Sequence, residues 1–292
     1  MTTTTITASA PVRTSVRPAS VPGGLLGQCL RQIRFELKDY VRHADTLVFT
    51  FGFPIIMLAI FTSAFASQGT IPNPDGVGLG LTVGAYYLPG MIAAGVLLSG
   101  VQNLAVDIAH EKSDGRLKRW GGTPMSPFVY FAGKIGQVVV TATAQTALLL
   151  VVAHSVLGIS LPATAQAWRT FAWVWLLGLT ASSLLGIALS ALPRSGRSAS
   201  SVVLPITLVL QFISGVYLQF YALPTWMQNL ASAFPLKWLA QGMRAAFLPD
   251  GFRQLEVGQS WNLGQVAIAL GVWLVLGVVL SRLTFRWIRR DA

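Results

Sequence analysis

Charge is scarce in this chain. Lys, Arg, Asp and Glu make up only 11% of its 292 residues, whereas 53% are hydrophobic, and the mean hydropathy is +0.60. A soluble globular domain carries roughly 25% charged residues. The composition therefore excludes an ordinary soluble enzyme and indicates a membrane protein.

Motifs for catalysis and metal binding are also absent. No G-x-x-x-x-G-K-[ST] pattern occurs, so the chain has no P-loop with which to hold ATP phosphates. The three histidines have no Cys or carboxylate at metal-ligand spacing, and the single cysteine, Cys29, has no partner for an internal disulfide. We expect no catalytic site, no metal site and no cofactor bound by this chain.

The first residues lack an apolar core. Residues 1–24 are mostly Thr, Ser, Ala and Pro, which is not the pattern of a secretory signal. Low hydrophobicity together with prolines predicts a disordered tail.

The chain does contain long uncharged segments. A helix needs roughly 20 apolar residues to cross a bilayer, and six segments are long enough. We expect spans at about 46–66, 80–106, 130–157, 168–192 and 201–221, and a sixth within 257–281. The sequence predicts an all-α integral membrane protein, and the lack of charge at the middle of any span disfavours ion-driven transport.

The basic residues favour one orientation. Cytoplasmic loops carry the excess of Lys and Arg, and an N-terminus inside the cell places all but four of the 21 basic residues on that side. The four exceptions are Arg169, Lys237, Arg244 and Arg253. Both termini are therefore predicted to be cytoplasmic. Membrane topology and anionic lipid headgroups account for the net charge of +11, so no nucleic-acid partner is expected.

An amphipathic helix is predicted over residues 25–43, before the first span. Its apolar positions recur at helical spacing: Leu26, Leu30, Ile33, Leu37 and Val41. A basic stripe follows the other side of the helix: Arg31, Arg34, Lys38 and Arg42. This pattern is typical of a helix that lies on the cytoplasmic membrane surface, with lipid as its partner.

The segment 222–250 is too apolar for an ordinary loop. Pro224, Pro235 and Pro249 divide it into pieces too short to span. Short re-entrant helices on the outer side are expected, and a loop resting on the outer membrane surface is the alternative. In the fourth span, small residues recur every four positions, which favours close helix packing over a pore lining: Gly178, Ser182, Gly186 and Ser190.

Charge gathers in the cytoplasmic segment 107–127, which by itself indicates only a loop that fixes topology. Two stretches of the sequence are more specific than this charge pattern. They are "EKSDGRLKRWGGTPMSPFVYFAGK" (Glu111 to Lys134) and "ISGVYLQFYALPTWMQNLASAFPLKWLAQGMRAAF" (Ile213 to Phe247). Together with six spans and an amphipathic lead-in, they resemble the type-2 ABC exporter permeases over nearly the whole chain from Leu25. Trp120 stands where an aliphatic residue is commoner in that family.

The resemblance implies partners and site residues. Segment 107–127 would be a coupling loop that docks on a separate ATPase subunit, present in two copies that hold ATP and Mg. Its contact residues would be Glu111, Asp114, Leu117, Lys118, Arg119 and Trp120. A second permease would complete the path between spans two and five; another copy of this chain is the simpler expectation, and a sister permease is the alternative. The candidate path residues are Ser99, Asn103, Thr207, Gln211 and Phe212, each of which could instead make helix-to-helix hydrogen bonds.

The expected function is ATP-driven export of an amphiphilic or hydrophobic compound, such as a drug or lipid-like product, by alternating access across a bacterial inner (plasma) membrane. A polysaccharide or glycolipid exporter is the alternative within the family. A membrane anchor that transports nothing and a lipid-modifying membrane enzyme stay open as other classes.

Overall fold

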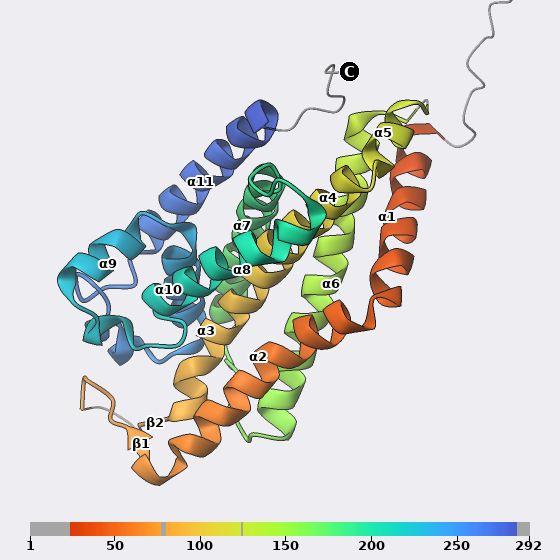
Figure 1. Ribbon diagram of the computed structural model, residues 1–292. Helices are drawn as coiled ribbons and strands as arrows, with labels where there is room; N and C mark the ends of the chain where they lie inside the picture. Colours follow the sequence, from red (N-terminus) through yellow and green to blue (C-terminus); the bar gives the residue numbers. More distant parts are fainter. Residues whose placement is uncertain (1–23, 77–79, 124, 285–292) are drawn as a thin grey trace, which may run out of the picture.

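Six helices of the structure are long and apolar enough to cross a membrane. The computed structural model describes residues 24–76, 80–123 and 125–284 (Figure 1). These candidate spans are α2 (Ala44–Ala64), the continuous helix Val83–Ser113, α6 (Pro127–Ser155), α7 (Ala165–Leu189), α8 (Gly196–Ile213) and α11 (Leu263–Thr284). The prediction of an all-α membrane protein with six spans is confirmed.

The second span forms the centre of the bundle. It consists of α3 (Val83–Leu97), a π-helical segment η2 (Leu98–Asn103) and α4 (Leu104–Ser113). Almost every residue of α3 is buried, and the span contacts α2, α7, α8 and α10. Figure 1 shows it running through the middle of the other helices.

The small residues of α7 allow close packing against this central helix. A Cβ atom on Gly186 would lie 2.2 Å from the carbonyl oxygen of Gly100 in η2. A Cβ on Gly178 would lie 2.4 Å from a methyl group of Leu239, and Ser182 is buried. The packing interpretation of this face is confirmed, since the face contacts protein along its length.

Two span ends differ from the expectation. The fifth span ends at Ile213 because Gly215 adopts φ +75°, a left-handed conformation that stops the helix. The second span continues seven residues beyond Val106 to Ser113. It is followed by α5 (Arg116–Gly121), a short helix that ends at Gly121, within the segment that would form the coupling loop.

Short elements lie between the spans. Two short strands, β1 (Thr70–Ile71) and β2 (Leu81–Thr82), pair antiparallel. The short helices predicted between spans five and six are α9 (Thr225–Ser232) and α10 (Pro235–Phe247), flanked by 3₁₀ turns Phe220–Ala222 and Asp250–Leu255. α10 is mostly buried against α3 and α7. Its Arg244 is paired with Glu256 inside the protein.

The first helix, α1 (Gly24–Arg42), packs along α6. Gly133 and Gly136 of α6 leave room for the side chains of Gln32 and Ile33. The predicted basic stripe is exposed in full: Arg31, Arg34, Lys38 and Arg42. Leu26 and Leu30 are exposed beside it, as an interfacial helix requires, and its place on the membrane surface stays a prediction.

The two ends of the described chain lie on the same side of the bundle. Figure 1 shows the end of α11, the beginning of α1 and α5 at one end, with β1 and β2 at the other. That this end faces the cytoplasm stays a prediction of the charge pattern. The tail predicted as disordered lies outside the described residues except for Gly24.

We predict that Gly186→Ala lowers the free energy of unfolding by about 1–3 kcal/mol, because the new methyl group would overlap the backbone of η2. Gly271→Ala in α11 is the matched control, since its Cβ would meet nothing within 4 Å. Thermal unfolding followed by size-exclusion chromatography measures both. Equal melting temperatures for the two variants would contradict the packing of α7 on η2.

Candidate functional site

A buried lysine joins three helices at the α5 end of the bundle. Lys134 of α6 has no exposed surface, and its ammonium donates to three carboxylates. Glu36 Oε2 of α1 is 2.7 Å away, Glu111 Oε1 of α4 is 2.9 Å away, and Asp107 Oδ2 of α4 completes the set. We call these four residues the Lys134 cluster.

Two carboxylates of the cluster have a further hydrogen-bond donor each. Glu111 also accepts a hydrogen bond of 2.7 Å from the hydroxyl of Tyr130, and Glu36 accepts one of 2.7 Å from Gln32. The three carboxylates lie close enough to one another to ligate a metal ion, but the Lys134 ammonium already bonds to each of them. Burial raises the pKa of the Glu36 carboxyl, and the positive charge of Lys134 opposes that rise.

This pairing explains why α4 continues past the predicted end of the span. Asp107 and Glu111 are four residues apart, so a helix places both on one face, and Lys134 meets that face. The charge pattern placed Lys134 among the cytoplasmic loop charges and gave no sign of its burial. The signal available in the sequence was the i,i+4 pair of acids, which has no basic partner at helical spacing toward the membrane.

Helix α5 is held against α1 by a second ion pair. Gly115, with φ +71°, turns the chain between α4 and α5. Arg116 Nη1 then lies 3.2 Å from Asp39 Oδ2 and 3.7 Å from Glu111 Oε1. The segment 107–121 is thereby attached to both α1 and α6.

The residues predicted to contact an ATPase do not all lie on the surface. Asp114, Lys118 and Arg119 are exposed. Glu111 is only 1% exposed and Leu117 only 5%, contrary to the expectation that both are available to a partner. Glu111 is held inside by Lys134.

Trp120, the last of the predicted contacts, is half-buried. It packs edge-on against the rings of Phe35 and Tyr130, at centroid distances of 6.2 and 5.2 Å. Its ring therefore connects α5 to both α1 and α6.

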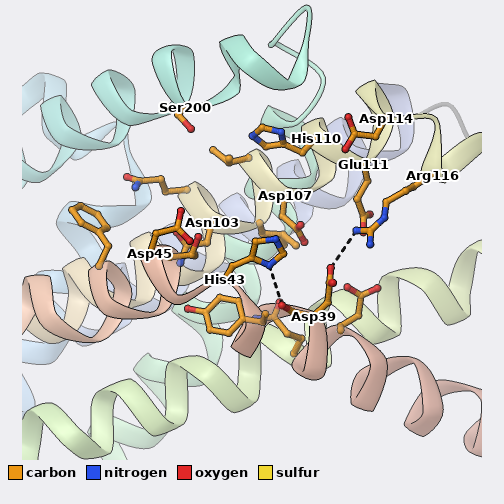
Figure 2. A pocket seen from close by; sticks show the side chains of 18 of the residues that line it. Asp39, His43, Asp45, Asn103, Asp107, His110, Glu111, Asp114, Arg116 and Ser200 are labelled. Atoms are coloured by element: carbon orange, nitrogen blue, oxygen red, sulfur yellow. Dashed lines mark hydrogen bonds and ion pairs between the residues drawn. The ribbon is translucent and has the colours of Figure 1, made fainter.

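A cavity of about 560 Å³ opens beside the Lys134 cluster. The junction of α1 and α2, the segment from η2 to α5, and α8 supply most of its wall, and α6 contributes Gln137. Figure 2 shows Asp39, Asp45 and Asp107 around this space, with Ser200 of α8 on the far wall.

A second cavity of about 250 Å³ adjoins the first. The two share Phe49, Gln102 and Leu204. Its other lining residues are largely apolar: Phe53, Pro54, Ala94, Leu98, Leu208 and Gln211. A cavity with many acidic residues in its lining thus lies beside a largely apolar one between α2, η2 and α8.

Two of the predicted path residues line these cavities and three do not. Asn103 lines the first and Gln211 lines the second. Ser99 is buried and donates to Gln145 of α6, at 3.0 Å. Thr207 is buried and donates to Gln102 Oε1, at 2.7 Å, whereas Phe212 is exposed on α8.

The π-helical segment lies where the cavities meet. Gln102 and Asn103 form its last two positions, and Asn103 also donates to Thr50 of α2, at 2.7 Å. π-helical turns inside α-helices occur frequently at functional sites. Pattern reasoning on the sequence gave no sign of this segment.

We predict that Lys134→Met destabilises the protein by about 3–5 kcal/mol, because three carboxylates then lose their buried cation. The loss depends on pH. Without Lys134, the folded-state pKa of Glu36 rises further above its ordinary value of 4.5. The protonated Glu36 carboxyl therefore contributes stability that is fully present below its ordinary pKa. This contribution is lost as the pH rises through the raised folded-state pKa.

Melting temperatures of Lys134→Met at pH 5 and pH 8 measure this effect. Lys112→Met removes an exposed lysine of α4 and is expected to change stability by less than about 0.5 kcal/mol. A destabilisation of Lys134→Met that is the same at both pH values would refute the pairing.

Comparison with known proteins identifies the family. The family described as ABC-2 family transporter protein matches residues 80–283, which include the central helix, the segment 107–127 and every span after α2. The search of curated proteins gave no match. Because the match extends over more than half of the sequence, the chain belongs to the ABC-2 transporter family and is a multi-pass membrane permease of the ABC exporter type, a transporter component and not itself an enzyme.

Proposed function

We propose that this chain is the permease subunit of an ATP-driven exporter that moves an amphiphilic or hydrophobic compound out of the cytoplasm. The observation that carries the proposal is the pair of adjoining cavities between α2, η2 and α8, one lined by acidic residues at the α5 end and the other largely apolar, with Phe49, Gln102 and Leu204 in both linings. A compound with a polar end and an apolar body matches that division. A polysaccharide would need polar partners along its whole length, which the second cavity lacks.

Alternating access requires the path to change between two states. In our proposal the helices around the cavity separate and close in response to ATP binding in a separate ATPase subunit, which holds ATP and Mg. The π-helical segment is a suitable place for such movement, because its hydrogen bonding departs from the regular helix on both sides of it.

The exposed surface of α5 is the proposed contact with the ATPase. Lys118 and Arg119 are exposed there. A force on α5 would act on α1 through Arg116 and Asp39, and on α6 through the Lys134 cluster. Two ATPase subunits would act on two permeases, most simply two copies of this chain in a bacterial inner membrane.

We predict that Leu204→Trp blocks export, because Leu204 borders both cavities and a larger ring would fill their junction. ATP-dependent efflux of Nile red and rhodamine 6G, from cells that express the chain with its ATPase, is expected to fall at least tenfold. Val209→Trp is the control, since Val209 is 57% exposed on the same helix and lines neither cavity. Unchanged efflux by Leu204→Trp at normal membrane levels would contradict the proposed path.

We also predict that Lys118→Glu combined with Arg119→Glu lowers substrate-stimulated ATP hydrolysis at least tenfold, because reversed charges at a docking surface weaken association. Arg194→Glu combined with Arg197→Glu makes the same change of charge on exposed residues near the beginning of α8. Phosphate release by the reconstituted complex is the measurement. Full stimulation of the α5 variant would remove this segment from the proposed interface.

A further inference from the structure

The acidic residues of this basic protein gather at one place. The chain has ten Asp and Glu against 21 Lys and Arg. Six of the ten line the larger cavity: Glu36, Asp39, Asp45, Asp107, Glu111 and Asp114. Among the residues that the structure describes, Arg116 is the one lysine or arginine in that lining. The cavity is therefore negative inside a chain whose net charge is +11.

Internal pairing leaves part of this negative charge free. Lys134 bonds to Glu36, Asp107 and Glu111, and Arg116 pairs with Asp39. Asp45, in the first turn of α2, and Asp114, at the end of α4, have no salt bridge within the described part of the chain. Both are exposed, so their charges are available to a molecule that enters.

The Lys134 cluster itself adds to the field. One ammonium bonds to three carboxylates there, and Asp107 keeps 43% of its side chain exposed. The histidines of the lining, His43 and His110, are exposed, and the His43 ring lies 3.0 Å from the carbonyl oxygen of Asp39. Neither histidine forms a salt bridge to an acid of the cavity among the described residues.

An apolar cavity adjoins this acidic one and shares Phe49, Gln102 and Leu204 with it. It is also bordered by Phe53, Leu98 and Leu208. The two volumes, about 560 and about 250 Å³, together suit one drug-sized molecule. A ligand would thus meet carboxylates at one end and hydrocarbon at the other.

We propose that this cavity selects amphiphiles that carry a positive charge, with the cation held near Asp45 and Asp114 and the apolar body lodged against Phe53 and Leu208. The inference rests on the proposed function and names the substrate class of the same site. The acidic cavity would also exclude anionic lipids, which are abundant amphiphiles in a membrane and would otherwise compete for the site. An acidic entrance repels their headgroups, whereas the exposed basic stripe of α1 attracts them outside it.

Binding to the permease alone tests the proposal. The purified chain in phosphatidylcholine nanodiscs is titrated into rhodamine 6G, a cation, and rhodamine B, which has a closely similar ring system but no net charge at neutral pH. Fluorescence anisotropy reports the affinity. Rhodamine 6G is expected to bind at least fivefold more tightly, and added salt is expected to weaken its binding only.

Asp→Asn substitutions test which carboxylates bind the positive charge of the dye. Asp45→Asn, alone and combined with Asp114→Asn, is expected to weaken rhodamine 6G binding about threefold and about tenfold, and rhodamine B binding less than twofold. Asp75→Asn removes an exposed acid in the β1–β2 connection and is expected to change neither affinity. Equal wild-type affinities for the two dyes, no binding of rhodamine 6G, or an unaltered double variant would each overturn the proposal.

This assay uses neither ATP nor an ATPase, so its outcome is separate from that of the proposed function. Binding without charge preference, in a complex that still exports dye with ATP, overturns the charge selection alone. Preferential binding of rhodamine 6G, in a chain that neither exports dye nor stimulates an ATPase, supports the site and overturns the exporter.

Discussion

The fold at the α5 end depends on the neutralisation of charge around Lys134. An ammonium with no exposed surface costs several kcal/mol to bury unless carboxylates surround it. The carboxylates that meet this requirement come from α1 and α4, whereas the lysine comes from α6. The position of α1, the continued helix of α4 and one wall of the larger cavity all follow from this single requirement.

Close packing imposes the other constraint. The central helix can lie deep within the bundle because α7 presents glycine and serine to it. Polar side chains inside the bundle then bond between helices, as Ser99 does with Gln145 and Thr207 with Gln102. These bonds replace the water that a membrane interior lacks. They also explain why candidate path residues chosen for polarity alone proved to be partly structural.

The two constraints together produce a site that is divided in polarity. The carboxylates that hold Lys134 also line the larger cavity, and apolar residues of α2 and α8 line the cavity beside it. In the proposed mechanism, substrate recognition and the connection between α4 and α6 therefore depend on the same residues. Asp107 lines the cavity and holds Lys134, so a displacement of α5 or α4 would alter the charge that a bound molecule meets.

The sequence by itself determined the six spans, the basic stripe of α1, the short helices α9 and α10, and the packing face of α7, because each depends on composition and periodicity within one segment. The interior position of Lys134, Glu111 and Leu117, the π-helical segment and the cavities were decided only by tertiary structure. Glu36 and Lys134 are 98 residues apart, and no local pattern records which distant charge will neutralise a buried one. That choice belongs to helix packing, which brings the residues together and removes the water that would otherwise solvate them.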